Sequence, residues 1–372
     1  MSDIPRIAHV IGRNSKGGVE SVVFNYYNFI DKSRYQFDLI IHNDSPYEIP
    51  DDILQLGCKV FKIPSYKYLF NYIKSLKNIF KNNNYKIVHS HMSTLSVFTL
   101  FAAKIANIPV RIAHSHVTAG KGKGEFFRNL LKYTLRLLAK VFPTHLFACS
   151  EYAGRWMFGN NCFEKGKVIV LNNAIDFKKF IFNESIRDKI RDNLALSDEF
   201  VVGNVGRFMP QKNHHYLIDI FNEIVKKDKK SILLLIGDGK LKEQIIKKVS
   251  QLGLQNNVLF LNPRDDVHDF FQVMDVFVLP SLYEGLGMVA IEAQISGLPT
   301  VVSSRVPNEV NLFDMVEFLD LNEKPERWAE IVLSKRSHKR RGISGEHRPH
   351  IKKFSIIDEV KRLETIYEEM LK

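Results

Sequence analysis

The feature that most constrains the fold is a repeated alternation of short Val- and Ile-rich runs with amphipathic stretches. In the first half of the chain six such runs are typical of strands, at 6–12, 37–42, 58–64, 86–91, 110–116 and 145–150. Helical patterns lie between most of them, for example at 19–30, 68–82 and 94–106. Apolar strands separated by helices form right-handed β-α-β units, so the pattern predicts a parallel sheet covered on both faces.

The alternation stops and then restarts in the second half. A polar stretch runs from about LNNAIDFKKF (171–180) to about residue 198. Further strands are expected at 200–207, 232–239, 258–263, 276–281 and 299–304. With 372 residues, 45% of them apolar, the chain is long enough for two cores. We therefore predict two doubly wound α/β domains, 1–177 and 178–354, with ligands at the carboxyl ends of their strands and in the cleft between them.

Charge and cysteine content narrow the class of protein. A net charge of +12 favours an anionic partner: nucleic acid, an acidic membrane surface or a phosphorylated substrate. The basic stretch 335–353 has no interleaved aromatic residues, so nucleic-acid binding is not expected. Three cysteines without metal-ligand spacing fit buried thiols in a reducing cytosol. No signal peptide or membrane span is expected, which favours a cytoplasmic protein.

Two glycines follow the first predicted strand and open the next helix. Gly17 and Gly18 stand in the sequence GGVE, where backbone N–H groups and the helix dipole can meet an anion. An ordinary strand-to-helix turn would look the same. The spacing is not the G-x-G-x-x-G of dinucleotide-binding proteins, which argues weakly against a nicotinamide enzyme.

Two cations follow the strand at 200–207. Arg207 ends that strand, and Lys212 comes five residues later, just before a helix. An arginine fork and a lysine point charge placed in this way suit a diphosphate. Solvated loop cations are the alternative interpretation.

The segment 280–303 carries the sharpest pattern. Glu284 lies at a strand end, and Gly285, Leu286 and Gly287 open a helix with backbone donors for phosphate or sugar oxygens. Glu292 follows eight residues after Glu284, about two helical turns along, so both carboxylates are expected to face one cleft. A carboxylate on an otherwise apolar helix requires a partner, for which a ribose diol is suitable. A structural glutamate capped by backbone N–H groups is the alternative.

Histidines end two of the predicted strands. His89 and His91 stand in IVHSH, and His114 and His116 in IAHSH. Residues two apart on a strand point to one face, so at least one histidine is expected to face substrate, with core histidines as the alternative. No nearby carboxylate completes a catalytic metal site, and no D-x-D occurs in the chain. We therefore expect neither a metal nor another cofactor, with cationic and backbone groups stabilising a leaving diphosphate instead.

Together these segments resemble retaining glycosyltransferase family 4 of the GT-B superfamily, over nearly the whole chain. The similar segments are GGVE, VHSH with IAHSH, ACSE, LNNAIDFKKF, VGRFMPQKNHHYLI, LLLIGDG and FVLPSLYEGLGMVAIEAQISGLPTVVS. The arrangement is most similar to bacterial enzymes of capsular and exopolysaccharide synthesis. Ala174 departs from the glycine usual at its position in the hinge segment, so a differently shaped turn is expected there and no contact is assigned to Asn173.

The resemblance implies a role for each matching residue. Arg207 and Lys212 would bind the donor diphosphate, Glu292 the ribose hydroxyls, and His114 the transferred sugar. Glu284 with the backbone of Gly285, Leu286 and Gly287 would hold the donor sugar and phosphate, and Gly17 and Gly18 would approach the diphosphate. The helix at 355–372 would return to the N-terminal domain. Front-face attack, in which the leaving phosphate helps to deprotonate the acceptor, would need no protein nucleophile.

The resemblance also implies a nucleotide-sugar donor and a saccharide or undecaprenyl-diphosphate-linked saccharide acceptor. A UDP-linked hexose or N-acetylhexosamine is expected over GDP-mannose. A GT-B-fold epimerase or phosphorylase, an inactive homologue and a basic nucleic-acid-binding protein are the alternatives.

A basic amphipathic segment suggests where such an acceptor is met. The segment 125–142 places Arg128, Lys132, Arg136 and Lys140 four residues apart, which makes one stripe on a helix. Its wide apolar arc fits a helix lying in an anionic membrane surface. We therefore expect peripheral association with the inner face of the membrane. A helix packed on the sheet with a solvated basic edge is the alternative.

Overall fold

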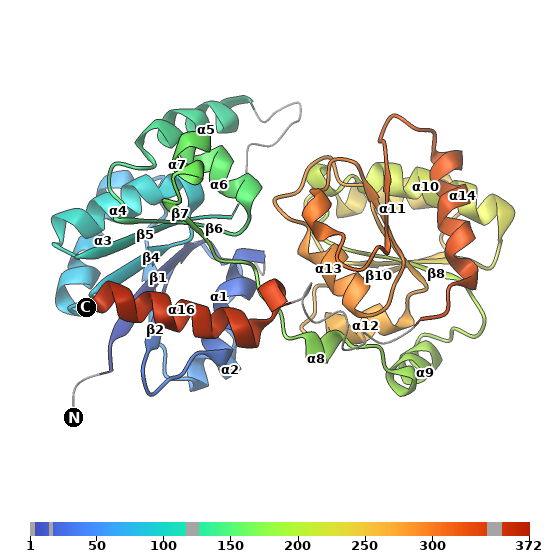
Figure 1. Cartoon of the computed structure of the whole chain (residues 1–372). Helices are drawn as coiled ribbons and strands as arrows, with labels where there is room; N and C mark the ends of the chain where they lie inside the picture. The colour runs from blue at the N-terminus through green and yellow to red at the C-terminus, as the bar shows by residue number, and fades with distance from the viewer. Residues whose placement is uncertain (1–3, 15–17, 117–125, 341–351) are drawn as a thin grey trace. The chain divides into compact units, whose positions relative to one another are not determined.

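The computed structural model describes residues 4–14, 18–116, 126–340 and 352–372 (Figure 1). The described residues divide into two compact units, one made of 4–14, 18–116, 126–175 and 352–372, the other of 176–340. Among the described residues, no helix has both the length and the hydrophobicity to cross a bilayer. The expectation of a two-domain α/β protein is confirmed.

The first unit is built around a seven-stranded parallel sheet in the order β3-β2-β1-β4-β5-β6-β7. Its strands are β1 Arg6–Gly12, β2 Gln36–His42, β3 Val60–Ile63, β4 Ile87–Ser90, β5 Val110–Ser115, β6 His145–Ala148 and β7 Val168–Val170. Its helices are α1 Gly18–Phe29, α2 Asp51–Gln55, α3 Leu69–Asn82, α4 Ser96–Ile105, α5 Phe126–Leu138, α6 Glu151–Phe158, α7 Asn160–Glu164 and α16 Ile356–Leu371.

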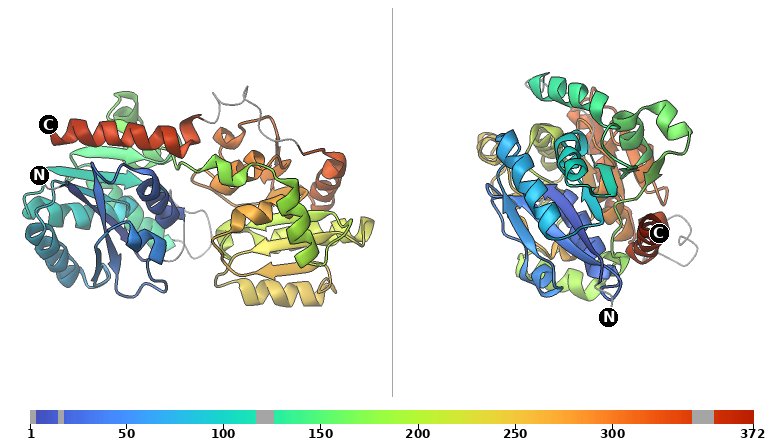
Figure 2. Two further views of the ribbon diagram at one scale, coloured as in Figure 1. Left: turned by 90° about the horizontal axis from the view of Figure 1, so that it is seen from below. Right: turned by 90° about the vertical axis from the view of Figure 1, so that its left-hand side faces the viewer.

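Both faces of this sheet are covered. On one face β1, β2, β4 and β5 pack against α1 and α16, and on the other they pack against α3, α4 and α6. The helix α16 contributes Ile356, Val360, Leu363 and Tyr367 to the first of these cores. Figure 2 shows α16, in red, lying along this sheet, and the expected return of the C-terminal helix to the N-terminal domain is confirmed.

The second unit repeats the same strand order. Its six parallel strands run β10-β9-β8-β11-β12-β13. They are β8 Val201–Val205, β9 Ile232–Ile236, β10 Val258–Leu261, β11 Val276–Leu279, β12 Thr300–Ser303 and β13 Val316–Leu319. The helices are α8 Phe177–Phe180, α9 Glu184–Asn193, α10 His214–Lys227, α11 Lys242–Gln251, α12 Val267–Val273, α13 Met288–Ile295 and α14 Pro325–Ser334.

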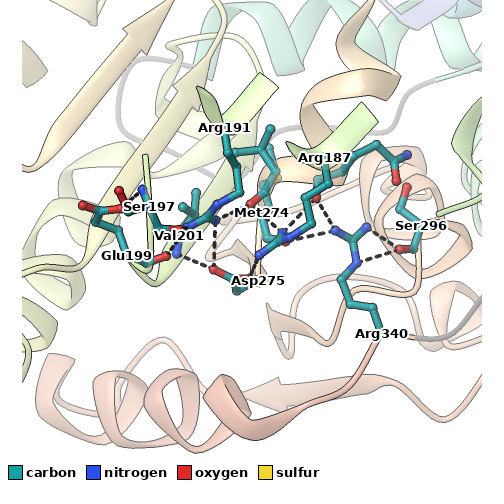
Figure 3. A network of polar contacts seen from close by, with 11 residues as sticks. Arg187, Arg191, Ser197, Glu199, Val201, Met274, Asp275, Ser296 and Arg340 are labelled. Atoms are coloured by element: carbon teal, nitrogen blue, oxygen red, sulfur yellow. Dashed lines mark hydrogen bonds and ion pairs between the residues drawn. The ribbon is translucent and has the colours of Figure 1, made fainter. Parts of the chain in front are cut away.

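The polar stretch before the second sheet contains a helix that the apolar pattern did not indicate. In α9, Arg191 is the one buried residue. Arg187 pairs with Asp275 at 2.6 Å and donates to the main-chain carbonyls at the end of α12, while Arg191 lies 3.7 Å from the same carboxylate. Arg340 donates to the carbonyl of Met274 in this group and to that of Ser296 at the end of α13 (Figure 3). Arginine forks, in place of an apolar stripe, attach α9 to the domain.

Candidate active site

The strand order of the second unit places its predicted site residues together at the carboxyl ends of two central strands. Since β8 and β11 are neighbours, the loops that follow them lie side by side at the carboxyl ends of the strands. This is the point where the strand order reverses, and ligands of doubly wound sheets bind there. The loop after β8 carries Arg207 and Lys212, and the loop after β11 carries Glu284.

Lys212 and Glu284 form an ion pair across these two loops. The Lys212 Nζ lies 2.8 Å from Glu284 Oε1, and both side chains are largely buried. Ser281 Oγ donates to the same carboxylate oxygen at 2.7 Å, and Gln211 Nε2 donates to the other at 3.1 Å. The Leu282 N–H also donates to the Gln211 carbonyl at 2.8 Å, which joins the loops through the main chain. The lysine charge is therefore held in place before any ligand arrives.

Glycines allow the loop after β8 to pack against its neighbours. A Cβ on Gly206 would lie 3.1 Å from Lys212 Cε. A Cβ on Gly237, after β9, would lie 2.1 Å from the Gly206 carbonyl oxygen, and one on Gly239 would lie 2.6 Å from that of Phe208. No site residue was predicted in the segment LLLIGDG, to which both glycines belong. Gly237 and Gly239 support the site by letting two backbones meet.

The helix α13 begins after Glu284. Gly287 takes a left-handed conformation, with φ of +88°, as the residue before the helix, which runs from Met288 to Ile295. Glu284 therefore lies in the loop before the helix, as expected of a residue at a strand end, and the eight residues from Glu284 to Glu292 are not two complete helical turns. The two carboxylates are instead related through Lys212, which pairs with Glu284 and electrostatically favours the charged form of Glu292.

Glu292 is a carboxyl group in an unfavourable position for charge. Burial raises its pKa to about 7, and the nearby Lys212 charge offsets part of that effect. No described residue donates a hydrogen bond to its carboxylate. The described protein thus leaves a hydrogen-bond acceptor open beside the lysine. Arg207, five residues before Lys212, is exposed at the same strand end.

In the first unit the predicted histidines belong to a buried cluster. His89, His91, His114 and His116 lie on the α16 side of the sheet together with His9 of β1, a member that the sequence analysis missed. His9 could have been found, because it faces the same way as its neighbours in register. Burial lowers the pKa of each of the five rings, so all five are neutral at pH 7.

The imidazole nitrogens form two separate hydrogen-bonded chains. In one, His91 joins His9 at 3.0 Å and His116 at 2.9 Å. In the other, His89 joins His114 at 3.0 Å and the Tyr367 hydroxyl of α16 at 2.8 Å. Two groups of three histidines have ring nitrogens within 4.8 Å of one another, a spacing that could also hold a metal ion. The first group is His9, His89 and His91, and the second is His91, His114 and His116.

The remaining predicted positions lie near the ends of β1 and β7. Gly17 falls outside the described residues, whereas Gly18 opens α1, and a Cβ there would meet no atom within 4 Å. Ala174 has no left-handed backbone, and its carbonyl accepts a hydrogen bond from the Asn25 side chain. The turn therefore avoids the conformation that alanine tolerates poorly.

Two family models match the chain. "Glycosyltransferase Family 4" matches residues 16–179, and "Glycosyl transferases group 1" matches residues 186–332. The putative glycosyltransferase EpsF of Bacillus subtilis is 34% identical over 332 residues, covering 88% of this chain and 86% of that protein. The Escherichia coli UDP-Gal:alpha-D-GlcNAc-diphosphoundecaprenol alpha-1,3-galactosyltransferase is 27% identical over 336 residues, covering 85% of each.

Solved structures share the fold. Anabaena HepE, crystallised with UDP and glucose, superposes with a TM-score of 0.78 at 19% identity, over 97% of this chain and 99% of that one.

Proposed function

Because the chain belongs to glycosyltransferase family 4 and is a glycosyltransferase of bacterial capsule- and exopolysaccharide-type biosynthesis, we propose that it transfers a sugar from a UDP-linked donor, with retention of configuration, to a lipid-linked saccharide. The observation that carries the proposal is the charged cluster at the ends of β8 and β11. Lys212 forms an ion pair with Glu284 at 2.8 Å, and the nearby Glu292 carboxylate can accept hydrogen bonds from a ligand.

Each group in this cluster suits one part of a nucleotide sugar. Lys212, with Arg207, would neutralise the diphosphate that accumulates charge as the glycosidic bond breaks. Glu292 would accept hydrogen bonds from the ribose diol. Glu284 and the backbone of Gly285, Leu286 and Gly287 would hold the sugar and the distal phosphate. In the first unit, His114 would contact the sugar and Gly17 and Gly18 the diphosphate. Positioning and charge stabilisation supply the catalysis, without a metal.

The choice of UDP and of a lipid-linked acceptor draws on the relatives. The name of the Escherichia coli relative gives UDP-galactose as donor and a diphosphoundecaprenol-linked sugar as acceptor, and HepE was crystallised with UDP. The test is a screen of purified nucleotide sugars for hydrolysis and transfer. Turnover of a UDP-sugar, with the anomeric configuration of the donor kept in the product, is the expected result. A strict preference for a GDP-sugar, or an inverted product, would refute the respective part.

A lipid-linked acceptor requires contact with a membrane, and we propose that α5 supplies it at the cytoplasmic face. Its inner side packs through Leu135, which is buried, as is Ala139 just after the helix. Among the described side chains, the exposed apolar and aromatic residues on and just after it are Leu130, Leu131, Tyr133, Leu137, Leu138 and Val141. Leu137 is 79% exposed. An apolar surface with interspersed cations suits the interface of an anionic bilayer.

A cavity beside α5 also supports the proposal that this helix contacts lipid. Its lining is Tyr133, Thr134, Arg136, Leu137, Lys140, Met157, Phe158 and Gly159. Arg136, whose guanidinium lies 5.6 Å from the centre of the Trp156 ring, combines there with Lys140 and apolar side chains. Cations next to apolar walls are the combination that a lipid phosphate and its acyl chains require.

Co-sedimentation with anionic vesicles tests this contact. Wild type should pellet with the vesicles and less so at high salt. Leu137→Gln should weaken binding, whereas Phe70→Gln, which alters a 78% exposed side chain on α3, should not. If changing Arg128, Lys132, Arg136 and Lys140 together to Gln leaves binding unchanged, α5 is not the anchor.

A further inference from the structure

The hydroxyl of Tyr367 ends a buried chain of hydrogen bonds that leads to His114. Tyr367 lies on α16 and is fully buried, and its hydroxyl is 2.8 Å from His89 Nδ1. His89 Nε2 is 3.0 Å from His114 Nδ1. The last nitrogen of the chain, His114 Nε2, is buried and has no hydrogen-bond partner in the described structure. One end of the chain is thus a phenol, and the other is an open ring nitrogen.

Proton counting allows only two arrangements of this chain. His89 and His114 are fully buried, and no described carboxylate is hydrogen-bonded to either ring, so each ring is neutral and carries one N–H. If Tyr367 donates to His89, then His89 donates from Nε2 to His114, and the His114 proton sits on Nε2. If the direction is reversed, His114 donates from Nδ1, His89 donates to the Tyr367 oxygen, and His114 Nε2 carries a lone pair.

The tyrosine decides between the two arrangements. In the reversed direction the Tyr367 O–H would need a second acceptor, but His89 is its one hydrogen-bond partner in the described chain. That direction leaves both the hydroxyl proton and His114 Nε2 unsatisfied in a buried place. The forward direction leaves only His114 Nε2–H open. Because each buried polar group without a partner costs free energy, the forward direction is favoured.

We propose that Tyr367 and His89 are positioning residues that hold His114 in the Nε2–H form, so that His114 presents a hydrogen-bond donor to an oxygen of the substrate. A ring in this form has no lone pair at Nε2 and does not act as a general base there. The ligand chemistry that fits is a hydroxyl or phosphate oxygen. This assignment rests on the proposed function for the identity of the ligand, whereas the tautomer itself does not depend on it.

The tautomer can be measured directly. In protein labelled with ¹⁵N-histidine, long-range proton–nitrogen NMR correlations identify which ring nitrogen carries the proton, and the spectrum of His114→Gln assigns the His114 signals. Both His89 and His114 should carry their protons on Nε2. Tyr367→Phe keeps the ring but removes the donor, and the two histidines should then become mixtures of both forms.

A matched variant separates the hydroxyl from the packing of α16. Tyr35 also lies under this helix, 5.9 Å from the Tyr367 ring centre, and its hydroxyl donates to the Glu364 carbonyl at 3.2 Å. Tyr35→Phe should leave the histidine signals unchanged. A proton on Nδ1 of His114 in wild type would overturn the proposal. Tyr367→Phe spectra equal to those of wild type would do the same, as would stoichiometric zinc bound by these histidines in the purified enzyme.

Kinetics supply the second readout. Tyr367→Phe should lower kcat/KM for the donor sugar about two- to tenfold, the range between an equal mixture of forms and the loss of one hydrogen bond. Its affinity for UDP alone should stay unchanged, because UDP lacks the transferred sugar that His114 is proposed to contact. Equal losses in UDP affinity and in transfer would point to general disruption and refute the positioning role. If no nucleotide sugar reacts with wild type, the proposed function is refuted. The NMR measurement then still tests, by itself, which nitrogen of His114 carries the proton.

Discussion

Glu292 is a carboxyl group whose ionisation the surrounding protein opposes. Its pKa is raised from 4.5 to about 7 by burial, and no described side chain or amide stabilises its charge by a hydrogen bond. A raised pKa in an acid means that the folded state binds a proton that the unfolded state releases. Stability contributed by this group is therefore lost as the pH rises from about 4.5 to about 7.

Donor binding should show the opposite trend. If the ribose hydroxyls donate to ionised Glu292, the KM for the donor should be up to about tenfold higher at pH 6 than at pH 8, following the ionised fraction. Glu292→Gln cannot ionise, so its donor KM should be high and nearly independent of pH in this range. An unchanged pH profile in this variant would show that another group titrates.

Lys212 and Arg207 should be the residues of the candidate site whose loss lowers transfer most. Lys212→Ala removes the cation opposite the developing diphosphate charge and leaves Glu284 buried without its ion-pair partner. We expect transfer to fall by about two to three orders of magnitude, and to a similar degree for Arg207→Ala, with the fold retained by circular dichroism. Lys230→Ala, at an exposed lysine paired with Asp198 at 3.4 Å, is the matched control. Near wild-type rates in folded Lys212→Ala would remove the assignment of the donor site.

The residue types of this site could be predicted from sequence, but their pairings could not. Two cations after one strand and two glutamates after another indicated phosphate and sugar chemistry. Nothing in the sequence showed that Lys212 pairs with Glu284, because the partners are 72 residues apart. His9 and Tyr367 were missed for the same reason, since sheet register and helix packing bring them to the histidines.

At the scale of elements, the loop after β9 tests how closely the backbone supports the site. In Gly237→Ala the new Cβ would lie 2.1 Å from the Gly206 carbonyl oxygen, so the main chain next to Arg207 must move. We expect a loss of about 2–4 kcal/mol in the free energy of unfolding, together with a higher donor KM. The measurements are denaturant unfolding and donor kinetics.

Gly253→Ala is the control for backbone strain alone. Gly253 also has a left-handed backbone, with φ of +70°, but no atom lies within 4 Å of a Cβ placed there. Its cost should be about 1–2 kcal/mol without a change in KM. Equal effects of the two substitutions would mean that the contact with Gly206 is not important.

Helices and strands with a periodic apolar pattern were predicted from the sequence to within a few residues. Elements without such a pattern were not predicted. The strand expected at 6–12 is β1, and the helix expected at 68–82 is α3. The polar helix α9 has no apolar stripe, because its buried contacts are arginine forks on carbonyls and on Asp275. The short strands β7 and β13 were also missed, and each lies at the edge of its sheet.

At the scale of the whole molecule, the absence of D-x-D predicts an enzyme that works without divalent ions. The charge that a metal would supply is instead available from Lys212 and Arg207. Transfer in excess EDTA should stay near the untreated rate. Loss of activity that manganese restores would contradict this prediction.

The two-domain architecture could be predicted from the sequence because each domain repeats one simple pattern. Buried parallel strands and amphipathic helices alternate twice along the chain, and both sheets have the same strand order. The return of α16 to the first unit, by contrast, was predicted only from the family resemblance. The pattern of Ile357, Val360, Leu363 and Ile366 shows an amphipathic helix but not which sheet it covers.

The position of α16 also sets an order of events during synthesis. It follows β7 by about 180 residues, so a ribosome adding about 5–20 residues per second makes it about 10–40 s later. Until then the first sheet has its α1 side only partly covered, because Val360, Leu363 and Tyr367 are not yet made. The second unit, whose strands and helices are contiguous in the chain, can fold before the first is complete. A chaperone that binds exposed apolar sheet surface would therefore find its target in the earlier-made domain.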